Sequence, residues 1–148
     1  MGELMGREMP PKVLNYLRGG RLVIVATVGP DGRPNSAPFS WVLALDSRTI
    51  RIGVNQGVAT LHNVKHNGFI ALSIVAADLF VTIKGTARVV RDAIEEAPLP
   101  TAVVEVQVEE VKDDAVIGRV KPGQEGTRWT DRRRLLSDTT ILAALERG

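Results

Sequence analysis

Apolar and polar residues alternate along much of the chain, with the period of two that is typical of β-strands. In residues 79–90, Leu79, Val81 and Ile83 alternate with side chains of the opposite face, and residues 103–111 show the same period. Such alternation indicates strands with one buried face. Together with turn signals between the segments, the pattern predicts six strands, at residues 22–28, 35–45, 49–54, 69–75, 79–90 and 103–111.

Short helices are predicted to flank these strands. Residues 10–17 and 58–67 place apolar side chains on one side and end at Gly or Asn-Gly, and residues 131–146 form a predicted tail helix. Residues 92–97 are expected to form one or two helical turns. Because the strand connections are short, the sheet should be antiparallel. Six such strands favour a closed or nearly closed barrel, which removes exposed sheet edges.

Two of the predicted strands, 22–28 and 69–75, are apolar on both faces. A barrel interior covers only one face of each strand. Large apolar patches are seldom left in water, so the second face predicts contact with another subunit, as in a homodimer. Gly85 interrupts the strand 79–90 and predicts a bulge or a close approach of the backbone to a cofactor or to the partner subunit.

Composition narrows the class of protein. The 148 residues predict one domain, 1–148, with a core of about 13–111 followed by the tail helix. The chain has no cysteine, which excludes disulfides, thiolate metal sites and cysteine nucleophiles. A net charge of +2 gives little support to nucleic-acid binding. No signal-peptide pattern and no bilayer-length apolar run is present, so we expect a cytoplasmic protein without membrane contact.

Three motifs, in their order, point to a known family. They are the hairpin segment 21–34, with its strand, Gly-rich turn and Pro34; the segment 59–72, with Ala-Thr-Leu-His-Asn-Val-Lys-His-Asn before an apolar strand; and Ile-Lys-Gly-Thr-Ala at 83–87. Together they resemble the pyridoxamine 5′-phosphate oxidase-like FMN-binding split barrels. The resemblance implies a mainly β, antiparallel, six-stranded split β-barrel with short flanking helices, and FMN bound at the interface of a homodimer.

The resemblance also implies which residues would bind the cofactor. The second strand would line the isoalloxazine ring through Ser36, Pro38, Phe39 and Ser40. The end of the third strand and the start of the short helix would hold the ribityl phosphate through Asn55, Gln56, Ala59, Thr60 and His62. A helix N-terminus suits a phosphate because it offers unpaired N–H groups and a positive dipole end.

One departure from the family pattern concerns the phosphate turn. The oxidase proper carries Ser-Arg-Lys where this chain has Val58, Ala59 and Thr60, so both cations are missing. FMN phosphate carries close to two negative charges, and the loss of two cations weakens its binding. Pyridoxamine phosphate oxidase activity is therefore not expected. Replacement cations could come from His62, Lys65, Arg51 or Lys84.

Several residues allow two interpretations. Thr60 is either a phosphate ligand or the N-cap of the short helix. Asn63 either contacts the cofactor or braces the turn, and Lys84 either reaches the cofactor or lies in solvent. Trp129 either stacks on the flavin or belongs to a solvated helix, whereas Trp41 is expected to pack in the core. His62 and His66 have a metal-ligand spacing, but no third ligand is evident and no metal site is expected.

These observations favour an FMN-dependent oxidoreductase or an electron-transfer flavoprotein, with a nicotinamide or another small molecule as the electron donor. Such a protein needs no acid or base of its own, because the cofactor carries the electron chemistry. Two other hypotheses stay open. The chain could be a split-barrel dimer that has lost FMN and serves a structural or ligand-binding role, or a barrel that uses a deazaflavin or haem.

Overall fold

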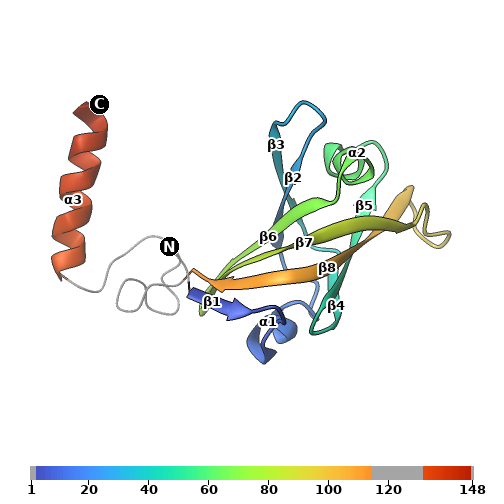
Figure 1. Ribbon diagram of the computed structural model, residues 1–148, viewed down its shortest axis with the longest axis horizontal. Coiled ribbons are helices and arrows are strands. Elements are labelled where there is room, and N and C mark those ends of the chain that lie inside the picture. Colours follow the sequence, from blue (N-terminus) through green and yellow to red (C-terminus); the bar gives the residue numbers. More distant parts are fainter. Residues whose placement is uncertain (1–2, 115–131, 148) are drawn as a thin grey trace.

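The computed structural model of the protein describes residues 3–114 and 132–147 (Figure 1). Strands predominate in the described part, and three helices accompany them. The strands are β1 (Glu3–Gly6), β2 (Val23–Val28), β3 (Pro34–Phe39), β4 (Val42–Asp46), β5 (Thr49–Asn55), β6 (Phe69–Ala76), β7 (Leu79–Arg91) and β8 (Thr101–Asp113). The helices are α1 (Pro11–Tyr16), α2 (Ala59–His66) and α3 (Arg132–Arg147).

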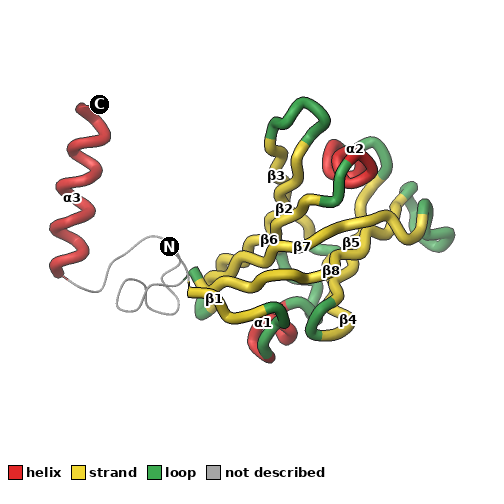
Figure 2. The backbone as a smooth tube through the Cα atoms, in the orientation of Figure 1, coloured by secondary structure: helices red, strands yellow, loops and turns green. Residues whose placement is uncertain are grey.

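The strands form one curved antiparallel sheet in the order β3-β2-β6-β7-β8-β5-β4, with β1 paired to β8 (Figures 1 and 2). The two outermost strands, β3 and β4, follow each other in the chain and are joined by Ser40 and Trp41. They pair with different neighbours, β3 with β2 and β4 with β5, so the barrel is split between them. The fold is the mainly β split barrel that was predicted.

Every predicted strand is present, although one is divided. The segment 35–45, predicted as one strand, forms β3 and β4 because the chain leaves the β2 ladder near Ser40 and enters the β5 ladder. The entry is marked by the hydrogen bond that the Gly53 N–H donates to the Trp41 carbonyl oxygen, at 2.8 Å. The short strand β1, which pairs with β8, was not predicted.

The interior of the barrel is built from the alternation seen in the sequence. Val81 and Ile83 of β7 and Val104 and Val106 of β8 are buried, while the residues between them face outward, as predicted. The ladder between these strands shifts register at Gly85, and a Cβ there would overlap the carbonyl oxygen of Gln107. The predicted bulge at Gly85 is therefore confirmed, and the backbone that approaches it closely is β8 of the same chain.

Residues 92–97 do not form the helical turns that were predicted. This segment belongs to the connection between β7 and β8, where the Ile94 N–H donates to the Thr101 carbonyl oxygen at 2.8 Å. Pro98 and Pro100 follow closely. Because proline lacks an N–H and restricts the residue before it, a helix cannot continue here.

The helices α1 and α2 lie at opposite ends of the barrel (Figure 1). Two buried or half-buried amides attach α2 to β2: Asn63 Nδ2 donates to Thr27 Oγ1 at 3.0 Å, and Asn67 Nδ2 donates to the Val28 carbonyl oxygen at 2.8 Å. The position of the α2 N-terminus relative to the sheet is therefore fixed by hydrogen bonds.

Several apolar side chains face outward from the barrel. Ile24 of β2 and Phe69 and Val75 of β6 are exposed on the outer surface, so both faces of these strands are apolar, as predicted. The helix α3 stands apart from the barrel (Figure 1) and exposes Ile141 and Leu145. No helix in the described part of the chain combines the length and the apolar character needed to cross a membrane.

Candidate functional site

Two adjoining cavities lie where the barrel is split. The first has a volume of about 420 Å³ and is bounded by β3, the link to β4, the end of β5 and the start of α2. Its volume falls within the range of about 300–1,000 Å³ typical of small-molecule pockets. The lining residues are Asn35, Ala37, Pro38, Phe39, Ser40, Trp41, Gly53, Asn55, Val58, Ala59 and Thr60.

The second cavity surrounds the N-terminus of α2 and has a volume of about 460 Å³. It shares Val58 and Ala59 with the first cavity, so the two are neighbours along one surface. Its other lining residues come from the preceding turn and from α2. They are Gln56, Gly57, Leu61, His62 and Lys65.

Most of the predicted cofactor residues lie in these two cavities. The residues that line the first cavity are Pro38, Phe39, Ser40, Asn55, Ala59 and Thr60, and those that line the second are Gln56, Ala59 and His62. Ser36 lines neither cavity, although its neighbours Asn35 and Ala37 line the first.

Lys84 and Trp129 are not brought to these cavities. Lys84 lines a different cavity on the outer face of β6 and β7, and its Nζ lies 3.8 Å from Glu110 Oε2. Within this chain, Lys84 therefore lies in solvent and does not reach the candidate cofactor site. Trp129 lies outside the residues that the structure describes.

Thr60 belongs to the wall of the first cavity and does not cap α2. The helix begins at Ala59, and its N-cap is Val58 in an extended conformation with no side-chain capping bond, so the prediction of Thr60 as the N-cap is wrong. Thr60 is only 2% exposed, and Asn35 Nδ2 donates to its Oγ1 at 3.4 Å. The Thr60 hydroxyl can accept that bond and still donate its own proton.

Buried threonines and amides hold the remaining polar groups of the site. The hydroxyl of Thr101, which is 1% exposed, shares its one proton between Asn55 Oδ1 at 3.1 Å and the Leu99 carbonyl oxygen at 2.9 Å. Gln56 Nε2 donates to the Asp92 carbonyl oxygen at 2.6 Å. Asn63 is buried and donates to Thr27, so it braces α2 in this chain and lines neither cavity. Because these side chains are anchored, the cavity walls are preorganised for a ligand.

Trp41 was expected in the core, and the structure corrects this prediction. The side chain is 56% exposed and lines the first cavity. A Cβ at Gly53 would lie 3.2 Å from both the Cβ and the Cε3 of Trp41, so only glycine allows the indole to rest this closely on β5. The alternation with the buried neighbours Val42 and Ala44 could have shown that Trp41 faces outward.

Sequence reasoning also did not choose among the four candidate cations. His62 and Lys65 both line the second cavity and are exposed. Lys84 lies elsewhere, and Arg51 Nη2 is 3.1 Å from Glu105 Oε2 on the outer face of the sheet. The first turn of α2 contains no acidic residue. The second cavity therefore suits an anion, because it contains the N-terminus of α2 and is also lined by the Lys65 ammonium and the His62 imidazole.

The first cavity has a different character from the second. Pro38 and Phe39 provide flat apolar surface, and the Asn55 side chain provides an amide within the same wall. A cavity with apolar walls and a few fixed polar groups suits a flat heterocycle. Within residues 3–114 and 132–147, no group of three or more His, Asp or Glu side chains could hold a metal ion.

Comparisons with known proteins were made with the sequence and with the structure. Residues 9–128 match the family model described as pyridoxamine 5′-phosphate oxidase. A search of the curated proteins finds no match.

Solved structures share the fold. A candidate pyridoxamine 5′-phosphate oxidase from Lactobacillus delbrueckii is 26% identical, with a TM-score of 0.62 over 75% of this chain and 98% of that one. HupZ from Group A Streptococcus is 24% identical, with a TM-score of 0.61 over 73% and 100% of the two chains. A protein named F420 reductase is 18% identical, with a TM-score of 0.58 over 70% and 98%.

Proposed function

The chain belongs to the pyridoxamine 5′-phosphate oxidase-like family, and from this premise we propose that it binds FMN and acts as an FMN-dependent oxidoreductase or an electron-transfer flavoprotein. One observation carries the proposal. The split of the barrel holds a cavity with apolar walls and fixed amides beside a cavity at the α2 N-terminus that is lined by His62 and Lys65. These are the two environments that a flavin ring and a phosphate require.

The residues present fit FMN. Pro38 and Phe39 would pack against the ring, and the anchored Asn55 amide would hydrogen-bond to its polar edge. The Thr60 hydroxyl, His62 and Lys65, together with the first N–H groups of α2, would hold the phosphate. When bound, FMN supplies hydride and single-electron transfer, while the protein orients it and excludes water.

The proposal does not extend to oxidation of pyridoxamine phosphate. Val58, Ala59 and Thr60 stand where the oxidase pattern has Ser-Arg-Lys, and the remaining cations of the phosphate cavity are His62 and Lys65. A nicotinamide or another small molecule is proposed as the electron donor. The identity of the second reactant depends on the surface beside the flavin cavity.

We also propose that the protein works as a homodimer. The outward side chains of β2 and β6 include Ile24 (36% exposed), Phe69 (70%) and Val75 (63%). A neighbouring pair of strands with such side chains is an apolar surface of the kind that a second subunit covers. Sedimentation velocity of the purified chain should show a species of twice the chain mass, and Phe69→Lys with Val75→Lys should shift it toward the monomer.

A titration with FMN tests the cofactor proposal. Cofactor-stripped protein should quench flavin fluorescence saturably at micromolar or lower concentration, which corresponds to about −8 kcal/mol or better. Thr60→Ala should weaken binding because it removes a hydroxyl from the cavity wall. Ser47→Ala, which removes a hydroxyl from the distant β4–β5 turn, should leave the affinity unchanged.

The absence of binding would favour the other hypotheses. If FMN does not bind near millimolar concentration, the missing cations are decisive, and the chain is a split barrel without flavin or one with another cofactor. Titrations with a deazaflavin and with haem, followed by their own absorbance bands, would then separate these two. Loss of binding in Ser47→Ala to the same degree as in Thr60→Ala would show that neither variant reports on a specific site.

A further inference from the structure

A third cavity adjoins the cofactor cavity on the outer face of β4 and β5. It has a volume of about 380 Å³ and shares Ser40, Trp41 and Gly53 with the first cavity. A molecule in this third cavity would therefore lie next to whatever occupies the first. The phosphate cavity instead meets the first cavity at Val58 and Ala59, so the third cavity and the phosphate cavity adjoin different parts of the first.

The walls of the third cavity are apolar. The lining includes Trp41 from the link before β4 and Leu43 from β4. It also includes Val103 from β8 and Ile94 from the connection between β7 and β8. Trp41 is 56% exposed and Leu43 is 47% exposed, so a flat ligand could cover both. Since large apolar side chains gain free energy when water is removed from them, this surface favours an apolar ligand.

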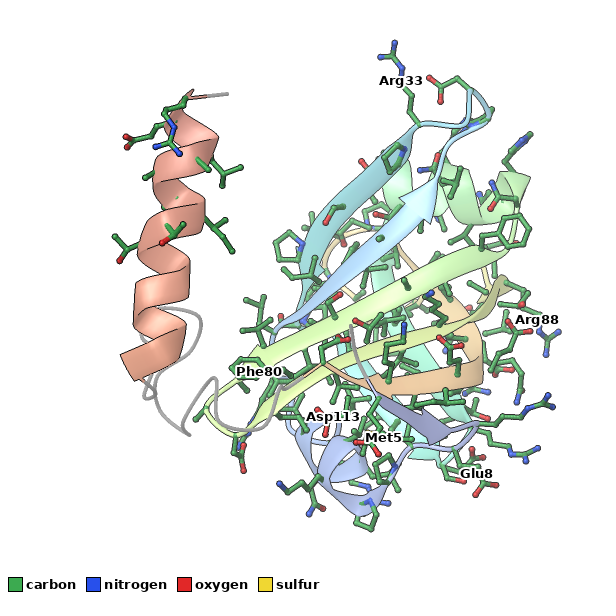
Figure 3. The ribbon with its side chains drawn as sticks, turned by 60° about the vertical axis from the view of Figure 1, so that its left-hand side comes forward. Met5, Glu8, Arg33, Phe80, Arg88 and Asp113 are labelled. Atoms are coloured by element: carbon green, nitrogen blue, oxygen red, sulfur yellow. The ribbon has the colours of Figure 1, made fainter. Side chains whose placement is uncertain are left out.

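The guanidinium of Arg51 at this cavity is already bound to a carboxylate. Arg51 is the charged residue of its lining, and Arg51 Nε donates to Glu105 Oε2 at 3.1 Å. Arg88 Nη2 lies 3.3 Å from Glu105 Oε1, and Figure 3 shows Arg88 projecting away from the barrel. An anionic ligand would have to compete with the Glu105 carboxylate for Arg51. Because the other walls are apolar, an anion would also lose its hydration there, and both effects favour neutral molecules of the same shape.

Trp41 forms the border between the two cavities. Its ring rests on Gly53, where a Cβ would lie 3.2 Å from its Cβ and Cε3, so the indole lies close against the strand. Aromatic ligands stack on such a ring in offset or edge-to-face arrangements. From this border position, a molecule that stacks on Trp41 also faces the cofactor cavity.

We propose that this third cavity is the substrate subsite of the flavin site and that it takes a neutral, flat, apolar molecule that stacks on Trp41. As a substrate subsite it depends on the FMN proposed above, whereas its preference for neutral aromatic ligands does not. A second copy of the chain is a less suitable occupant, because the outer face of β2 and β6 offers that copy a separate surface with Ile24, Phe69 and Val75 exposed.

Two probes with the same ring system test the charge preference. Isothermal titration calorimetry of the FMN-loaded chain should show that uncharged 2-acetylnaphthalene binds once per chain, and that the anion 2-naphthoate binds at least about tenfold more weakly. Equal affinity for the two probes would overturn the proposal. So would loss of 2-acetylnaphthalene binding on loading FMN, because the probe would then simply occupy the flavin cavity.

Variants in β4 and in the link before it test where the probe binds. Trp41→Ala should weaken 2-acetylnaphthalene binding by about tenfold, and Trp41→Phe should restore most of it because a flat ring is kept. Leu45→Ala removes a side chain of β4 that is 44% exposed and does not line the cavity, and it should leave the affinity unchanged. An unchanged affinity in Trp41→Ala, with urea unfolding showing an intact fold, would overturn the proposal.

Fluorescence separates the remaining outcomes. Trp129→Phe leaves Trp41 as the one tryptophan, and the neutral probe should quench its emission saturably. A chain that binds the probe in this way but takes no FMN would refute the proposed flavin function and support the cavity as an apolar ligand site. If Trp41 emission shifts to shorter wavelength with rising protein concentration while probe binding falls, a second copy covers the cavity, and the proposal is wrong.

Discussion

The two sides of the barrel are built differently. On the closed side, β7 and β8 are 13 residues each and pair along most of their length, and alternate side chains such as Ile83 and Val106 are fully buried. On the split side, β3 is six residues long, none of its side chains is buried, and the chain changes partners at Ser40 and Trp41. The two cavities of the candidate site and the third cavity beside them lie on the split side.

This difference separates the source of stability from the place of binding. A continuous ladder satisfies the backbone groups and buries apolar area, whereas a strand that leaves its ladder exposes side chains to a ligand. The split side is nevertheless held in place by paired polar groups, such as Asn35 with Thr60 and Asn55 with Thr101. We therefore expect changes on the closed side to affect unfolding and changes on the split side to affect binding.

The largest expected effect is on the closed side. Ile83→Ala should lower the free energy of unfolding by about 2–5 kcal/mol, because it leaves a cavity in a fully buried position. The affinity of the folded fraction for FMN should not change. Urea unfolding followed by far-UV circular dichroism measures the first quantity, and flavin fluorescence measures the second.

Phe39→Ala is the matched change on the split side. Phe39 is half-buried and lines the first cavity, so its truncation should cost less stability than Ile83→Ala and weaken FMN binding more. If Phe39→Ala destabilises the fold as strongly as Ile83→Ala, the separation between the two sides does not hold.

A smaller effect is expected where the two sides are connected. Asn63→Ala removes the bond to Thr27 and leaves a buried hydroxyl without its donor, which should cost about 1–3 kcal/mol. FMN affinity should fall as well, because α2 loses an attachment to β2. The double variant Asn63→Ala with Thr27→Val should recover part of the stability, since both polar partners are then gone. Additive losses in the double-mutant cycle would contradict this coupling.

A change in charge at the second cavity should alter binding alone. Lys65→Met keeps an apolar stem but removes the cation, so FMN affinity should fall by about tenfold, or about 1.4 kcal/mol. Riboflavin, which lacks the phosphate, should bind both proteins equally. Lys12→Met in α1, at the opposite end of the barrel, is the control and should affect neither ligand. Equal weakening of riboflavin would place Lys65 near the ring.

The closed side was the easier part to predict from sequence. In β7 and β8 the period of two in Leu79–Val89 and Val104–Val108 matches the buried positions directly, because each strand has one neighbour on either side and one buried face. The split could not be predicted from this period. Residues 35–45 keep an extended conformation on both sides of Ser40, and only the partner strands change.

The candidate site was predicted in part, through the family resemblance. The positions at the start of α2 and at the end of β5 lie together because these elements adjoin in sequence. Trp41 and Gly53 were missed because their contact depends on the β4–β5 register, which sets a side chain of one strand over a glycine of the other. The choice of His62 and Lys65 among the candidate cations likewise required the tertiary structure.

The smallest expected effect concerns the turn between β4 and β5. This turn lies at the end of the barrel away from α2 (Figure 1). The Arg48 N–H donates to Asp46 Oδ1 at 2.9 Å, and this bond, with the Thr49 hydroxyl, lowers the pKa of the Asp46 carboxyl below its ordinary value of 3.8. A carboxyl whose pKa is lowered by folding stabilises the folded state above its unfolded pKa. This contribution disappears as the pH falls through the folded pKa.

Asp46→Asn tests whether the ionised carboxylate stabilises the folded state, because asparagine keeps an acceptor oxygen for the Arg48 N–H but carries no charge. The variant should be slightly less stable than the unmodified protein above about pH 5, where the unfolded carboxyl is ionised. The difference should shrink as the pH falls below 3.8 and vanish when the carboxyl is protonated in both states. Urea unfolding between pH 2 and 7 measures it. The turn is exposed and distant from α2, so the FMN affinity of Asp46→Asn at neutral pH should be unchanged. A loss of FMN affinity in this variant would mean that the β4–β5 turn positions the cavity walls.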